Sequence, residues 1–124
     1  MYNYVMVEST NLIPINNIQD RILDFDCLLD TTKSLYVKNC NGLTIIINNK
    51  INKITIDKSN NITILVSKLV SGLEISNSNN IIISMIDMIP SIDMFKSIVY
   101  LNGPIEMYKD VQITSDKSWL YNIN

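Results

Sequence analysis

Hydrophobic and polar positions form short blocks that return at a fixed interval along the chain. A triplet with apolar ends, and in most copies a polar middle, recurs every nineteen residues, at Leu35–Val37, Ile54–Ile56, Leu73–Ile75, Ile92–Met94 and Val111–Ile113. A second series lies between these triplets, at Leu43–Ile45, Ile62–Ile64, Ile81–Ile83 and Tyr100–Leu101. An alternation with a period of two predicts strands with one buried face.

Two interleaved series with one period indicate a repeat architecture. An interval of nineteen residues is too short for helical repeats or propeller blades, but it accommodates two short strands and two corners. The pattern therefore predicts an all-β fold, a parallel β-solenoid whose coils stack about 4.8 Å apart with each strand on its equivalent.

The residues between the strands support stacked corners. Each first-series strand is followed by a small residue in the same phase, namely Cys40, Ser59, Ser78, Ser97 and Asp116. Next come the pairs Asn41-Gly42, Asn60-Asn61 and Asn79-Asn80, and Asn and Gly tolerate left-handed backbone conformations. A compositional bias would explain the abundance of Asn but not its phase. We expect ladders of Asn side chains and a small, buried Cys40.

Both ends of the chain depart from the repeat. We expect residues 1–17 to be an N-terminal cap, 18–102 the coils and 103–124 a C-terminal strand and hairpin. Ile18–Asp30 is predicted to be a degenerate coil, in which Asp24–Asp26 aligns with Leu43–Ile45, and a short helix is the alternative. Asp116–Ser118 is predicted to turn a hairpin. An isolated hairpin is marginally stable, so it must pack on the end of the solenoid or on a second chain. We expect the second, a homodimer formed by exchange, through Val111, Ile113, Lys117, Trp119 and Tyr121.

Composition excludes several functions. A net charge of -2 disfavours nucleic-acid and anionic-membrane binding. Two cysteines without histidine provide neither a zinc motif nor a disulfide framework, and Asp24 with Asp26 is better explained as a solvated face than as a metal site. No nucleophile–base pair or glycine-rich phosphate loop is present, so we expect no cofactor, no metal and no enzyme. Without a basic leader or a long apolar segment, the expected location is the cytoplasm.

Lysines gather in the regular coils, at positions 38, 50, 53, 58 and 68. Two explanations remain open. They could keep an exposed face soluble and protect strand edges, or they could align into a basic stripe that binds a partner.

Several short motifs resemble one family. The segment Lys50–Asp57 resembles the G-K-I-N-S-I-T-V-D segment in the C-terminal domain of cyclase-associated proteins, which regulate actin monomers. Further similarities, in the same order and spacing, cover about residues 25–123, at Cys40, Glu74-Ile75, Asn77-Ser78, Ile89-Pro90, Ile92, Ile113, Ser115, Lys117-Ser118 and Asn122. The chain differs in having Asn49 where the family has glycine.

The resemblance implies a right-handed parallel β-helix that dimerises by exchanging a C-terminal hairpin. It also implies a short form without the N-terminal domain, which binds ADP-loaded monomeric actin and promotes nucleotide exchange, associated with the cytoskeleton. The expected actin contacts lie on one flat face of the coils, which suits a protein better than a small molecule. The candidates are Lys50, Asn52, Thr55, Asp57 and Glu74.

Three alternatives remain. A β-helix of the tubulin-cofactor-C type would act as a GTPase regulator through an arginine finger, but the sole arginine, Arg21, lies outside the regular coils and lacks the family's Q-x-R context. An ice-binding solenoid would need an unbroken threonine column, whereas Ile82 interrupts the one formed by Thr44 and Thr63. The third is a structural solenoid that has lost actin binding.

Overall fold

The structure, a computed structural model, describes residues 11–85, 87 and 89–123. Most of the expected N-terminal cap therefore lies outside the described residues. The elements are β1 (Leu12–Asn16), β2 (Gln19–Asp26), β3 (Ser34–Lys38), β4 (Asn41–Asp57), β5 (Asn60–Ser76), β6 (Asn79–Met85), β7 (Ser91–Phe95), β8 (Ile98–Asn102), the 3₁₀ helix η2 (Ile105–Tyr108), β9 (Gln112–Asp116) and β10 (Trp119–Asn122).

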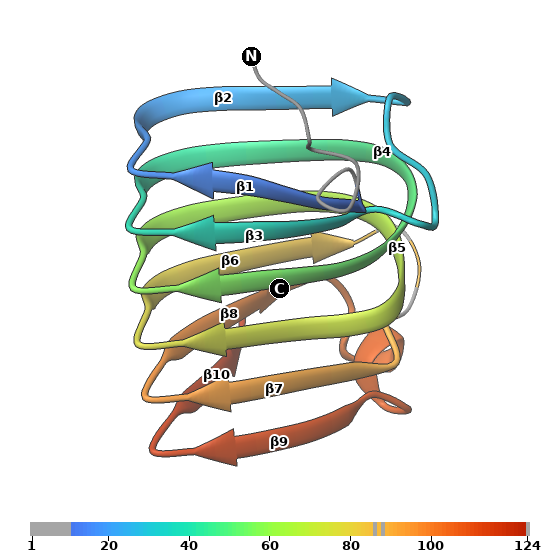
Figure 1. Cartoon of the computed structure of the whole chain (residues 1–124). Helices are drawn as coiled ribbons and strands as arrows, with labels where there is room; N and C mark the ends of the chain where they lie inside the picture. Colours follow the sequence, from blue (N-terminus) through green and yellow to red (C-terminus); the bar gives the residue numbers. More distant parts are fainter. Residues whose placement is uncertain (1–10, 86, 88, 124) are drawn as a thin grey trace.

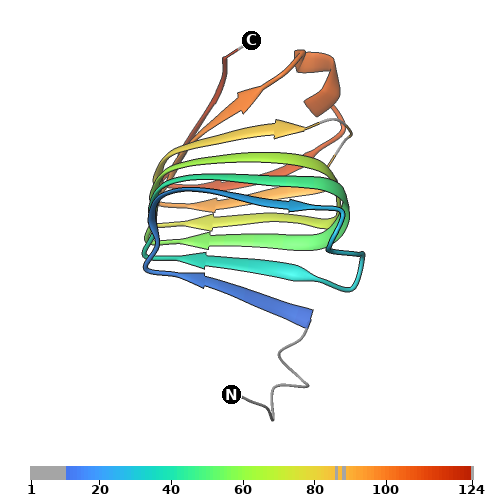
Figure 2. The same ribbon diagram turned by 90° about the horizontal axis from the view of Figure 1, so that it is seen from above.

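The strands wind into a right-handed parallel β-solenoid (Figure 1). Face A, toward the viewer in Figure 1, consists of β1, β3, residues 50–57 of β4, residues 68–76 of β5, β7 and β9. Face B, behind it, consists of β2, residues 41–47 of β4, residues 60–66 of β5, β6, β8 and β10. The view from above shows the two faces enclosing one interior (Figure 2). The expected fold class is confirmed.

The nineteen-residue step is observed as strand register. Leu35 pairs with Ile54, Ile54 with Leu73 and Leu73 with Ile92 on face A, and face B repeats the step from Leu43 to Ile62 and Ile81. Parallel pairing in this register places equivalent residues above one another, so the apolar ends of the triplets form continuous inward columns. These columns are buried, and complete burial of one such side chain contributes about 1.5–3 kcal/mol.

At corner 1, which turns the chain from face A to face B, small residues form a hydrogen-bonded column. The backbone N–H groups of Cys40, Ser59, Ser78 and Ser97 each donate to the hydroxyl of the next coil, over 2.9–3.2 Å. Each serine hydroxyl also donates to the carbonyl two residues before it, as Ser78 does to Ser76. Cys40 is buried, as expected. The last member is Ser118, so the assignment of Asp116 to this column is wrong.

The asparagine ladder predicted at corner 1 is confirmed. The Nδ2 of Asn61 donates to Oδ1 of Asn41 over 2.9 Å, and that of Asn80 donates to Oδ1 of Asn61 over 2.5 Å. Gly42, Asn61 and Asn80 all have positive φ, at 77°, 58° and 58°. Both roles foreseen for these residues, left-handed backbone and side-chain pairing, are therefore observed.

The first coil is a strand-built coil, not a helix, but its register differs from the expectation. Arg21 pairs with Leu43 and Asp24 with Ile46, so the predicted alignment of Asp24 with Leu43 is wrong by three residues. The longer connection between β2 and β3 absorbs the extra residues. Part of the expected cap, β1, is itself a coil strand paired with β3; its Pro14 is tolerated because β1 is an edge strand.

The C-terminal hairpin is not present, and this prediction is wrong. β9 pairs with β7, and β10 pairs with β8, both in parallel. Asp116–Ser118 turns corner 1 instead, and Lys117 has the φ of 52° found at equivalent corners. Because β9 and β10 add in parallel to β7 and β8, they extend the inward columns of both faces by one more coil. An antiparallel hairpin would not extend them. The spacing between paired residues also departs from nineteen here. Ile81 pairs with Val99, which is 18 residues later, and Ile92 pairs with Ile113, which is 21 residues later. The longer connection before Ile113 contains η2.

Candidate protein-binding face

Three of the five candidate actin contacts lie together on face A. Thr55 and Glu74 are direct register partners on neighbouring coils, and Asp57 pairs with Ser76 at the end of the same strands. All three are outward positions of the alternating pattern and are partly exposed. The parallel register thus assembles, from two segments nineteen residues apart, a single polar surface.

Fixed polar contacts hold these side chains. Lys53 Nζ lies 2.9 Å from Glu74 Oε2. Asp57 Oδ1 accepts hydrogen bonds from the Ser76 hydroxyl at 2.8 Å and from Asn77 Nδ2 at 3.4 Å. Lys53 was not among the contact candidates predicted from the sequence. It lies two residues before Thr55, which is one period of the strand alternation, so both side chains are on the same outward face.

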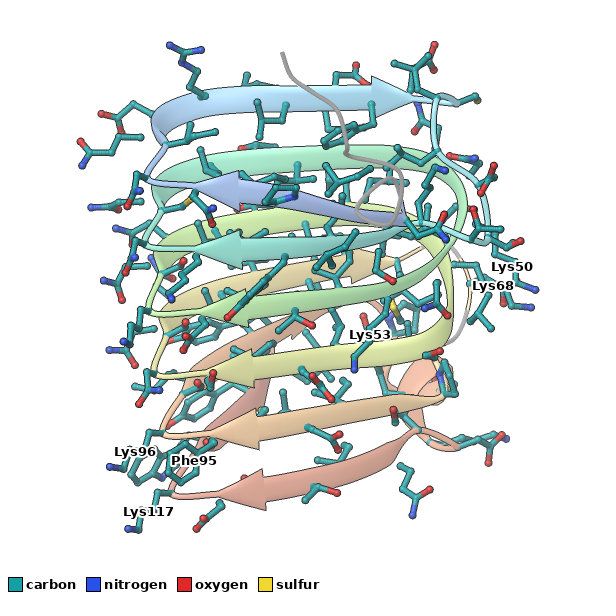
Figure 3. All side chains as sticks on the ribbon, viewed as in Figure 1. Lys50, Lys53, Lys68, Phe95, Lys96 and Lys117 are labelled. Atoms are coloured by element: carbon teal, nitrogen blue, oxygen red, sulfur yellow. The ribbon has the colours of Figure 1, made fainter. Side chains whose placement is uncertain are left out.

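The other two candidates lie at corner 2, which turns the chain from face B to face A. Asn52 has a structural role there, because its amide donates to the Ser34 hydroxyl at 3.0 Å and accepts from the Ser71 hydroxyl at 2.7 Å. Lys50 is exposed and in register with Lys68 on the next coil (Figure 3). The two lysines border a surface depression of about 280 Å³ that includes Val70 and Pro90.

Charge is distributed unequally between the two faces. Beyond the first coil, every charged strand residue belongs to face A or its border with the corners, at positions 38, 50, 53, 57, 68, 74, 93 and 116. The corresponding strand segments of face B carry none, over residues 41–47, 60–66, 79–85, 98–102 and 119–122. This segregation was visible in the sequence once each strand was assigned to a face.

The surface of face A is shallow. Its depression of about 240 Å³ is bordered by Thr55, Glu74, Asp93 and Phe95, among others, whereas small-molecule sites are usually deeper and more enclosed. Within the described residues, no group of three or more metal-ligating side chains comes together. In the same part of the chain, no helix is long and apolar enough to cross a membrane. A flat, charged sheet surface is suited to contact with another protein.

The predicted dimer residues surround the open end of the last coil. Val111 and Ile113 belong to the face A side, Lys117 to corner 1, and Trp119 and Tyr121 to face B. They are therefore not one hairpin. Tyr121 stacks on Tyr100 of the preceding coil, with ring centroids 5.4 Å apart.

This end contains a cavity of about 510 Å³. It lies where the inward columns end without a further coil, and its lining includes Leu101, Tyr108, Ile113 and Leu120. The buried Tyr108 donates its hydroxyl to the carbonyl of Asn102 at 2.9 Å, and burial raises the pKa of this phenol.

Fold and surface together define a class, the parallel β-solenoid with one flat, charged face. The family is also defined: residues 14–124 match the model of the adenylate cyclase-associated (CAP) C-terminal domain, and the chain belongs to this family. This membership supports an actin-binding role in general, in a class of non-enzymatic proteins.

The fold is also found in a solved structure of a cyclase-associated protein. The crystal structure of cyclase-associated protein from Cryptosporidium parvum superposes with a TM-score of 0.77 at 22% sequence identity, covering 91% of this chain and 74% of that one. A search among proteins of curated function finds no match.

Proposed function

We propose that this protein binds ADP-loaded monomeric actin in the cytoplasm and promotes exchange of the nucleotide. Family membership supports the actin-binding part. The observation that carries the assignment to face A is the grouping of Thr55, Asp57 and Glu74 on its two central coils, within a surface that has charged residues where the strands of face B beyond the first coil have none. We place Lys50 at the border of this contact surface and Asn52 in its support.

The route to exchange is differential binding. A protein can shift actin between conformations only by the difference in its affinity for them. If face A binds actin with an open nucleotide cleft more tightly than actin with a closed cleft, ADP leaves faster. No group of this chain needs to contact the nucleotide, so the proposal requires no catalytic residue.

The test is release of a fluorescent nucleotide from ADP-actin monomers, titrated with the protein. We expect a dose-dependent acceleration that is lost in Asp57→Lys/Glu74→Lys. Thr44→Lys, on face B, is the control and should keep the acceleration. If wild-type protein neither accelerates release nor binds actin in a sedimentation assay, the proposal is wrong. If the protein binds actin but does not accelerate nucleotide release, only the proposed binding to actin monomers would remain.

We also propose that the protein is a homodimer joined at the open end of its last coil. The support is the apolar cavity there, which exposes the end of the core, together with exposed Ile113, Trp119 and Tyr121. An unpaired strand edge favours pairing with another chain.

Light scattering tests this dimer, and it should give the mass of a dimer for the wild type and of a monomer for Ile113→Lys/Trp119→Lys. Ile22→Lys, exposed at the opposite end, is the control. A monomeric wild type at micromolar concentration would contradict this.

A further inference from the structure

A column of left-handed residues runs along corner 1. In each coil the residue that directly follows the face A strand is a non-glycine residue with a φ between 50° and 58°. In every coil but the last, the N–H of this residue donates to a carbonyl of the next coil over 2.9–3.2 Å, as Asn39 does to Asp57. The members in order are Asn17, Asn39, Lys58, Asn77, Lys96 and Lys117.

Asparagine is the expected residue here, because its short polar side chain is several-fold enriched in the left-handed region. Three coils use it. Lysine has no such local advantage, yet it occupies the other three positions. Residues that break a local conformational preference without a structural gain point to a function of the side chain.

The three lysine side chains are exposed and available. Among the residues that the structure describes, Lys58, Lys96 and Lys117 form no ion pair, since the two salt bridges found there involve Lys53 and Lys68. Lys96 and Lys117 are on adjacent coils, about 4.8 Å apart along the stack, and Lys58 lies two coils before Lys96. Figure 3 shows Lys96 and Lys117 projecting from the same edge.

Neighbouring groups offset this charge only in part. The preceding column contains Lys38, Asp57, Phe95 and Asp116 among its members. A hydrogen bond does not neutralise a carboxylate, so Asp57 and Asp116 offset two of the four lysines along this edge, Lys38 included, and an excess of positive charge remains. Phe95 is 40% exposed, and its ring lies 5.2 Å from the ammonium group of Lys96. The edge therefore combines a row of cations with one apolar contact.

We propose that Lys58, Lys96 and Lys117, with Phe95, form a docking edge for an acidic segment of a protein partner. This edge adjoins face A, because Phe95 borders the same depression as Thr55 and Glu74, but its three lysines are not among the actin-contact candidates. A single row of lysines on a chain of net charge -2 is a poor match for nucleic acid or an anionic membrane, which favour a basic face. The partner's carboxylates would pair with successive lysines while an adjacent apolar side chain contacts Phe95.

The probe is a hexaglutamate peptide, titrated into ¹⁵N-labelled full-length protein and followed by amide chemical shifts. We expect shifts concentrated at the three lysines and Phe95, with a dissociation constant on the order of 1 mM, since exposed ion pairs are individually weak. In 0.5 M NaCl the shifts should be lost by screening. Shifts that persist in salt, or that are spread evenly over all lysines, would overturn the proposal.

Variants provide a matched comparison. Lys96→Asn/Lys117→Asn installs the residue that other coils already use at this position, so folding should be retained and the melting temperature unchanged or raised. Lys33→Asn/Lys109→Asn removes the same charge elsewhere. We expect the peptide shifts to weaken at least five-fold in the first variant and to persist in the second. Equal weakening in both, or binding of an oligothymidylate but not of hexaglutamate, would show that the edge does not select acidic protein.

Discussion

Lys53 and Glu74 form an ion pair of 2.9 Å across two coils at the centre of face A. The residue directly opposite Lys53 is Gly72, which has no side chain, and Glu74 lies two residues further along the same strand. The pair is diagonal, so both charges remain accessible at the surface while each restricts the other's side-chain freedom. This arrangement presents Glu74 in a defined position for a partner.

Glu74→Gln separates the contribution of this charge to binding from its contribution to folding. The pair is substantially exposed, so the free energy of unfolding should change by less than about 1 kcal/mol. The affinity for ADP-actin should fall about five-fold or more, as expected for loss of one charge from a protein contact. Sedimentation with ADP-actin measures the second effect, and Asp110→Asn, exposed outside face A, is the control. An unchanged affinity would remove Glu74 from the contact surface.

Ser78→Ala tests the buried serine column. The substitution removes the acceptor of the Ser59 N–H and leaves that buried group unpaired, which should reduce the free energy of unfolding by about 1–3 kcal/mol. Cys40→Ala should have a smaller effect, because none of the described backbone N–H groups donates to the Cys40 sulfur. Urea unfolding midpoints compare the two, and equal losses would contradict the role given to the hydroxyl.

Gly72→Ala should be among the most damaging single changes. An added Cβ would lie 2.4 Å from the carbonyl oxygen of Ser91, and φ at this position is +127°. We expect a loss of about 2–4 kcal/mol in the free energy of unfolding. At Gly42, by contrast, the equivalent residues of the next two coils are Asn61 and Asn80, and the added Cβ would clash only with the side-chain Oδ1 of the exposed Asp20, at 2.5 Å. Gly42→Asn should therefore cost much less than Gly72→Ala, because the Asp20 side chain can rotate away. Thermal unfolding of both variants is the measurement, and a stable Gly72→Ala protein would refute the steric argument.

Tyr108 predicts a pH dependence above neutrality. Burial raises the pKa of its phenol above the usual value of 10.0, so the folded protein favours the neutral form. Its contribution to stability is complete below about pH 10 and is lost as the pH rises toward the folded-state pKa. Tyr108→Phe should lose about 0.5–1.5 kcal/mol at pH 8, through the hydrogen bond to Asn102, but it should decline less steeply above pH 10. Parallel decline of both proteins in urea titrations would argue against this.

The regular coils were predictable because strand alternation and corner chemistry have the same phase. Leu35, Ile54 and Leu73 fix the register on one face, and the Asn pairs place corner 1. The ends were not predictable to the same degree, because there the connections change length: residues 27–33 lengthen the first coil, and η2 lengthens the last. A longer connection leaves the hydrophobic pattern within the strands unchanged, so the sequence does not reveal it. An alignment that assumes a constant step of nineteen residues is then displaced by the number of added residues.

The mistaken hairpin had a signal against it. Asp116-Lys117-Ser118 repeats the tripeptide Asp57-Lys58-Ser59, which turns corner 1 three coils earlier. The candidate face was partly predictable for the same reason as the coils, since Thr55 and Glu74 share a column. The distribution of charge between the faces depended on knowing which strands stack, and the structural role of Asn52 depended on the hydroxyls of Ser34 and Ser71, both from other coils.

The serine column at corner 1 has a consequence for how such a molecule changes in evolution. Each coil presents to its neighbour the same donors and acceptors that it receives from the coil before, as Ser59 and Ser78 do. A duplicated block of nineteen residues would therefore join the stack without any new partner, whereas a single inserted residue within Ile62–Ile64 would turn apolar side chains outward. Outside the connections, the protein can gain length only in whole coils, and with each one it would widen the surface it offers to a partner.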